Sequence, residues 1–173
     1  MKKITAIFVL YIATTLLIYC GSSSAIQEPN AVGTYAFKIL KDFKNVSEQA
    51  FLNKLLTYES LQETINKEGN TIADRTKNEF KRMTKEDYNS RITRDYDEIK
   101  AKAEEFGIVW NQIEYVNYTS KEKTRDGIKG SDGKLYFSHN GEKYTVTISA
   151  MDFGNGYSII ELERLRKDSG DNY

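Results

Sequence analysis

The stretch KLYFSHNGEKYTVTISA, residues 134–150, carries the clearest fold signal in the chain. Asn140-Gly141 lies between two segments rich in β-branched and aromatic residues, and this pair accepts the positive φ angles of a type I′ turn. After the turn, apolar residues alternate with threonine and serine, as in a strand buried on one face. The stretch therefore predicts an antiparallel β-hairpin, with a buried side made of Tyr144, Val146, Ile148 and Ala150.

Segments on both sides of this hairpin extend the same pattern. Residues 108–120, IVWNQIEYVNYTS, are rich in β-branched and aromatic side chains and predict an earlier strand. The glycines of residues 126–133, DGIKGSDG, predict a loop, and DFGNG at 152–156 predicts a turn. Residues 157–165, YSIIELERL, then form the last strand.

The chain before Gly107 has the apolar spacing of helices. Ser47, Thr57 and Thr84 each precede such a pattern, and their side-chain oxygens can accept a free amide of a first helical turn. The longest pattern runs from Thr84 to Gly107 in steps of three and four residues. Apolar positions of these helices include Ala36, Ile39, Leu40, Phe43, Phe51, Leu55, Leu61, Ile65, Ile92, Ile99 and Phe106.

The order of these elements predicts an α+β fold. N-terminal helices, one of them long, are followed by an antiparallel meander of about four strands, with the helices packed on one face of the sheet. We expect a single domain at 33–166, preceded by a short linker at 26–32 and followed by a frayed tail at 167–173.

The first residues predict export. Lys2 and Lys3 are followed by the uncharged run 4–19, and this layout is typical of a secretory signal peptide. The run is short for a membrane span, which needs about 20 apolar residues. We therefore expect residues 1–25 to be a leader of bacterial type.

Two cleavage positions remain open. Leu17 stands at the −3 position of a lipobox, which would end the leader at residue 19 and make Cys20 a lipid attachment point, although Tyr19 is unusual at −1. Ser23 and Ala25 instead fit the small-residue rule for a cut after Ala25. The expected location is the periplasm or, with the lipid, the membrane of the cell envelope.

Charge and composition limit the functions that the mature chain can have. The leader removes Lys2 and Lys3 from 25 basic residues and nothing from 25 acidic residues, so the mature net charge is −2. This balance disfavours nucleic-acid binding, and it leaves the lipid at Cys20 as the expected membrane contact. We expect no metal and no cofactor, and we expect His139, the only histidine, to be an exposed turn residue.

Carboxylates on the long helix offer a weak catalytic signal. Asp95, Asp97 and Glu98 are close in sequence, but Arg91 and Arg94 lie beside them. Such mixed charge is typical of a solvated helix face. We therefore predict no catalytic residues here.

Tyrosine is unusually frequent, with twelve residues in the chain. Tyrosine and tryptophan suit both an aromatic-lined cavity and a partner surface. The alternative is that these rings form the rim of the core between helices and sheet. The candidate binding residues are Trp110, Tyr115, Tyr136, Tyr144 and Tyr157.

The order of elements from Ala31 to Arg166, with Gly156-Tyr157 before the final strand, resembles small exported bacterial proteins with an NTF2-like or cystatin-like domain. The resemblance implies a curved antiparallel sheet that wraps a helix. NTF2-like enzymes usually keep Asp, His or Tyr in the cone, and no histidine is expected inside this one. The QxVxG hairpin of inhibitory cystatins is absent, which counts against protease inhibition.

Three functions follow as hypotheses. The first is an exported, non-catalytic envelope protein that binds an unknown protein or small molecule on the concave face of its sheet. The second is an NTF2-like enzyme that uses carboxylates and tyrosines in the sheet cavity. The third is a structural or assembly subunit of the envelope, acting through the sheet edge or the long helix.

Overall fold

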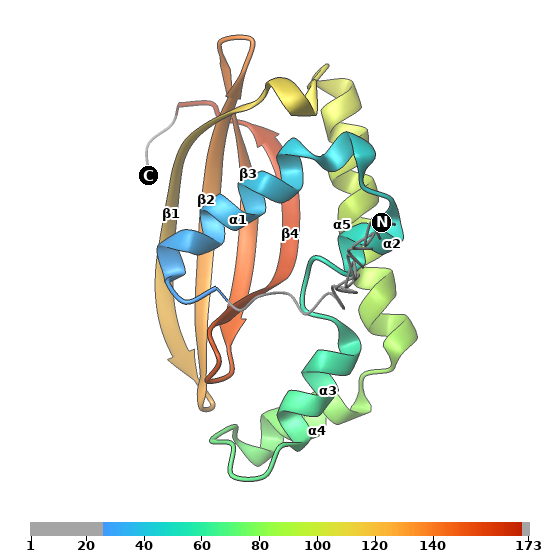
Figure 1. The fold of residues 1–173 in the computed structure, drawn as a ribbon, viewed down its shortest axis with the longest axis vertical. Helices are drawn as coiled ribbons and strands as arrows, with labels where there is room; N and C mark the ends of the chain where they lie inside the picture. Colours follow the sequence, from blue (N-terminus) through green and yellow to red (C-terminus); the bar gives the residue numbers. More distant parts are fainter. Residues whose placement is uncertain (1–25, 171–173) are drawn as a thin grey trace, which may run out of the picture.

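The computed structural model describes residues 26–170, so the predicted leader, Cys20 and the last three residues of the tail lie outside the described part. The predicted α+β order is confirmed: helices come first and a four-stranded antiparallel sheet follows (Figure 1). The elements are α1 Pro29–Lys41, η1 Phe43–Asn45, α2 Glu48–Leu52, α3 Tyr58–Asn66, α4 Asp74–Arg82, α5 Lys85–Glu105, η2 Trp110–Gln112, β1 Glu114–Arg125, β2 Ile128–His139, β3 Glu142–Asp152 and β4 Tyr157–Lys167.

The four strands form a meander in the order β1-β2-β3-β4. Asn140 and Gly141 have φ angles of 51° and 79°, as the predicted type I′ turn between β2 and β3 requires. Asp126 and Gly127 form a second turn of the same kind between β1 and β2, with φ angles of 53° and 80°. Two-residue turns of this type continue the twist of the flanking strands, so β1 and β2 pair along their whole length.

The loop predicted at 126–133 is wrong, because β2 begins at Ile128 immediately after the turn. Gly127 belongs to the turn, whereas Gly130 and Gly133 are strand residues, and Gly133 makes room for a neighbouring side chain. A Cβ atom on Gly133 would lie 2.6 Å from the ring of Tyr118. Glycine in a strand often marks such a close approach. Here the frequency of glycine in residues 126–133 led to the wrong prediction of a loop.

The predicted helix starts are confirmed by side-chain caps. The hydroxyl of Ser47 accepts a hydrogen bond from the Ala50 amide at 3.3 Å, and Thr57 and Thr84 cap α3 and α5 in the same way. Gly107 ends α5 with a φ angle of 63°. The capping residues fix where α2, α3 and α5 begin, as expected from their short-range chemistry.

Residues 26–32, expected as a linker, are part of the folded unit. The amide of Ile26 donates to the Tyr157 carbonyl at 3.0 Å, and the Tyr157 amide donates back at 2.7 Å. Helix α1 begins at Pro29, whose fixed φ angle suits a first helical position. Within residues 26–170, no helix has the length and apolar character needed to cross a membrane.

Helix α1 crosses one face of the sheet diagonally (Figure 1). The crossing is close at Gly33, because an added Cβ atom would lie 2.3 Å from Cγ of Tyr118 on β1. The Tyr118 ring is therefore held between Gly33 of the helix and Gly133 of β2. These two glycines set the distance between α1 and the sheet.

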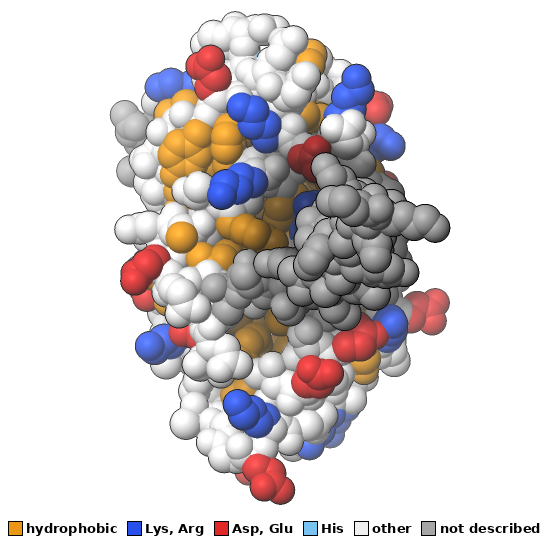
Figure 2. All heavy atoms as spheres, in the orientation of Figure 1, with side chains coloured by type: hydrophobic (Ala, Val, Ile, Leu, Met, Phe, Trp, Pro, Cys, Tyr) orange, Lys and Arg blue, Asp and Glu red, His pale blue; other side chains and the backbone are white. Residues whose placement is uncertain are grey.

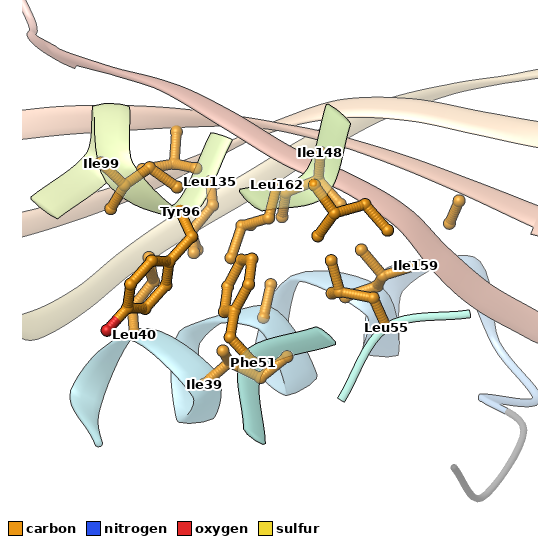
Figure 3. Packing of buried hydrophobic residues seen from close by; sticks show 14 of the residues in the cluster. Ile39, Leu40, Phe51, Leu55, Tyr96, Ile99, Leu135, Ile148, Ile159 and Leu162 are labelled. Atoms are coloured by element: carbon orange, nitrogen blue, oxygen red, sulfur yellow. The ribbon is translucent and has the colours of Figure 1, made fainter. Parts of the chain in front are cut away.

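The core lies between α1, α2, α5 and the sheet, and Phe51 of α2 points into its centre (Figure 3). Helix α5 runs along β4. The Leu56 amide donates to the Ile159 carbonyl of β4 at 2.7 Å, so chain segments also cover this sheet edge. The predicted packing of the sheet on the helices is confirmed, and α5 and its neighbours also continue around the β4 edge.

Candidate functional site

Two of the five aromatic candidates lie in the core. Trp110 is buried, and its ring centroid lies 5.1 Å from that of Phe43. Tyr144 is buried and stacks on Phe137 with centroids 5.6 Å apart. Phe137 also lies 6.2 Å from Trp110, so these rings form one aromatic cluster inside the fold. This placement agrees with the core alternative for both residues.

The other three candidates lie in separate places. Tyr157 is buried at the Ile26 pairing, where burial and its hydrogen bond to Glu122 raise the pKa of Tyr157 to about 12. Tyr115 is 43% exposed on β1, and its ring centroid lies 5.4 Å from that of Phe37 on α1. Hydrophobic side chains gather on the α1 side of the molecule (Figure 2). Tyr136 pairs with Thr145 on the face opposite α1. The five residues therefore do not form a single binding site.

The prediction that His139 is exposed is wrong. Its side chain is buried, and Nε2 accepts a hydrogen bond from the Val109 amide at 3.2 Å. The residue ends β2 on the face that α1 crosses, and the segment before η2 covers it. His139 therefore holds the Val109 backbone in place, a contact between distant parts of the chain that turn chemistry could not reveal.

A different pocket is found on the sheet face opposite α1. It has a volume of about 370 Å³, within the range of small-molecule sites. The sheet contributes positions whose side chains alternate away from α1, among them Gly130, Ser149 and Met151. Helical side chains close the other side of the pocket and are mostly apolar: Leu61, Phe80, Met83, Tyr88, Arg91 and Ile92.

The charged residues of this pocket are paired. Arg91 of α5 lies 2.9 Å from Glu161 of β4, and Lys123 of β1 pairs with Asp132 of β2. Each pair crosses between elements, so the side chains are held at the pocket margin. The lining therefore has charged groups but no net charge.

Tyr88 gives the pocket a phenol that is already engaged. Its hydroxyl donates to the Leu56 carbonyl at 2.5 Å. Burial, and then the negative charge of Glu161, raise the pKa of Tyr88 well above its usual value, and Arg91 offsets part of this effect. The Tyr88 side chain therefore positions the α2–α3 connection and keeps its proton at neutral pH.

A second cavity of about 260 Å³ adjoins the first under α4. The two cavities share four lining residues, Phe80, Lys123, Gly130 and Met151. The cavities therefore form one groove between α4 and the sheet. Thr76 donates to Asp126 at 3.0 Å, which ties α4 to the turn between β1 and β2. We call this combined space the α4 groove.

The α4 groove contains a signal that sequence reasoning missed. The chain has three methionines, and the two after the initiator, Met83 and Met151, both line it. Methionine is flexible and polarisable, and it is frequent at adaptable binding surfaces. Two isolated methionines have no diagnostic spacing, so only the fold could bring them together.

The prediction of a solvated helix face is wrong for Asp95, which is 3% exposed. Burial, and then the charges of Glu163 and Glu161 on β4, raise the pKa of Asp95 from its ordinary 3.8 to about 6, while Arg94 and Arg91 on α5 oppose the shift. The Arg94 Nε atom is 4.0 Å from the carboxylate. Asp95 faces β4 because it follows Ile92 by three positions, which places both residues on one side of α5.

Replacing Asp95 with asparagine is expected to raise the free energy of unfolding at neutral pH by on the order of 2 kcal/mol. The folded state binds the Asp95 proton more tightly than the unfolded state, so the contribution of Asp95 to native stability falls as pH rises from about 4 to about 6. The Asp95→Asn variant lacks this titration. Its advantage should be complete above that window and absent below it.

Denaturant unfolding of both proteins across this pH range measures the effect. Asp97→Asn is the matched control, because Asp97 lies on the same helix and is exposed. An Asp95→Asn gain that is the same at every pH would show that the carboxyl does not titrate in the window.

The comparisons with known proteins give no family assignment: no family model, curated protein or solved structure matches this chain. Residues 26–170 contain no group of three or more His, Cys, Asp or Glu side chains arranged to hold a metal ion. The candidate site therefore rests on the geometry of the α4 groove.

Proposed function

We propose that this protein is an exported, non-catalytic binding protein of the cell envelope that takes a small apolar ligand into the α4 groove. Export is supported by the leader pattern of residues 1–25. Binding is supported by the volume of the groove and its mostly apolar lining. The sheet face that α1 crosses is filled by core side chains, so we place the ligand on the opposite face.

We infer the class of ligand from the ion pairs formed by the charged residues of the groove. Arg91 and Lys123 already have carboxylate partners at the groove, and on α4 Arg75 pairs with Glu79 at 3.1 Å. An ionic ligand would only exchange one partly exposed ion pair for another, so it would gain little free energy from these charges. A neutral, apolar molecule leaves all the pairs in place.

Filling the groove tests this proposal. Gly130 lines both cavities, and a Cβ atom added there has only an ordinary 3.7 Å contact with Lys123. The Gly130→Leu variant is expected to lose binding of N-phenyl-1-naphthylamine, a neutral fluorescent probe. Its stability should be unchanged or higher by about 0.5–1 kcal/mol, because glycine weakens a strand.

The measurement is a fluorescence titration together with thermal unfolding. Lys129→Leu is the control, since Lys129 is exposed on the same strand and does not line the groove. If the wild-type protein does not bind the neutral probe, or if both variants bind it like wild type, the groove is not the site.

The enzymatic hypothesis has one observation in its favour, because Asp132 and Glu161 do line the pocket. Both carboxylates are ion-paired, and the Tyr88 hydroxyl donates a hydrogen bond to a backbone carbonyl. These contacts favour a structural role for the three side chains, which hold neighbouring parts of the chain in place, over a role in proton transfer. We therefore place binding first, and we keep the resemblance to NTF2-like or cystatin-like domains as a proposal about the fold.

A further inference from the structure

A separate pocket of about 330 Å³ lies between η1, the last turns of α5 and η2, at the end of the molecule away from α4 (Figure 1). Phe43, Tyr96 and Trp110 form its floor, and all three side chains are buried. The Phe43 centroid lies 5.0 Å from Tyr96 and 5.1 Å from Trp110. The floor is therefore a continuous aromatic surface held by core packing.

The mouth of this pocket is basic. Lys44 and Lys100 are exposed at its margin, and neither forms an ion pair with any residue in the range 26–170. The Lys100 ammonium lies 6.0 Å from the ring centroid of Tyr96. Glu104 is the acidic residue of the lining, so the charged groups sum to a net positive charge.

We propose that this pocket, which we call the Trp110 pocket, is a second binding site for a small organic anion with an aromatic or apolar body. The body packs on the aromatic floor, and the anionic group pairs with Lys44 and Lys100. This site differs from the α4 groove in its ion pairing. Lys44 and Lys100 form no ion pair with the described residues, whereas the cations of the α4 groove already have carboxylate partners. The inference is independent of the proposed function, because the two sites share no residue.

A pair of matched probes tests the inference. 8-Anilino-1-naphthalenesulfonate carries the same ring system as N-phenyl-1-naphthylamine, with an added sulfonate. At low ionic strength, Lys44→Gln and Lys100→Gln are each expected to weaken binding of the sulfonate probe by roughly two- to fivefold, as for an exposed ion pair. Binding of the neutral probe should not change.

Lys102→Gln is the control, because Lys102 lies on the same helix, has the same charge and is outside the pocket. An equal loss of sulfonate binding in Lys102→Gln, or no loss in the two pocket variants, would overturn the site. Gly130→Leu should remove the neutral probe and leave sulfonate binding intact. Failure of the α4 groove and failure of the Trp110 pocket are thus separate results.

Chemical labelling of wild-type protein provides a measurement without mutation. The sulfonate probe is expected to slow acetylation of the Lys44 and Lys100 amines, read by mass spectrometry, and to leave Lys102 unchanged. Equal labelling rates with and without the probe at all three lysines would contradict binding in the Trp110 pocket.

Discussion

Replacing Phe51 with alanine is expected to lower the free energy of unfolding by about 3–5 kcal/mol, the range for a buried phenylalanine. Phe51 is fully buried and points into the core between α1 and the sheet (Figure 3). Its ring centroid lies 5.6 Å from Phe43 and 5.4 Å from Tyr96. Removal of this ring therefore leaves a cavity beneath α2, among the aromatic side chains that it contacts.

Urea unfolding of the Phe51→Ala variant measures this loss. Gln49→Ala is the control, since Gln49 belongs to the same helix and is exposed. A loss below about 1 kcal/mol for Phe51→Ala would mean that α2 collapses into the space or is not docked as described.

Replacing Gly33 with valine is expected to cost about 3 kcal/mol, at the upper end for overpacking. The new Cβ atom would lie 2.3 Å from Cγ and 2.4 Å from Cβ of Tyr118. Both atoms are close to the β1 backbone, so the tyrosine cannot swing away. Helix α1 must lift from the sheet, and the aromatic and aliphatic contacts beneath it are weakened.

Thr34→Val places the same side chain at an exposed position of α1 and serves as the control. A double-mutant cycle with Tyr118→Gly, which removes both Cγ and Cβ of Tyr118, isolates the steric contact. The cost of Gly33→Val should be much smaller once the whole Tyr118 side chain, including its Cβ atom, is absent. An unchanged cost in the double mutant would show that the effect comes from the helix itself and not from the crossing.

The parts of the fold that could be predicted from sequence are those fixed by short-range chemistry. The Asn140-Gly141 turn needs two residues that accept positive φ angles, and its neighbours alternate in burial as predicted. The caps at Thr57 and Thr84 act over three residues. Such signals lie within one stretch of sequence, so they can be read before the fold is known.

The errors arise where a distant part of the chain changes the environment of a residue. Gly133 is a strand residue that leaves room for the Tyr118 ring, and His139 is buried because the Val109 segment covers it. Asp95 has the sequence neighbours of an exposed residue, but β4 packs against it. In each case the deciding contact is separated by many residues and leaves no periodic signal.

The candidate sites follow the same division. Aromatic frequency did single out Trp110, which lines the pocket proposed to bind an organic anion. The lysines that give that pocket its charge come from η1 and α5, and no spacing connects them. The α4 groove depends on how one helix stands over the sheet, which the sequence pattern of that helix does not specify.

The pairing of Ile26 with Tyr157 limits the length of any linker between the folded domain and a lipid anchor. If Cys20 carries a lipid, only residues 21–25 separate the anchor from the sheet, and six peptide steps span at most about 20 Å. The end of β3 near this attachment carries Met151 of the α4 groove. An anchored molecule would then keep its groove close to the bilayer surface, where apolar molecules concentrate.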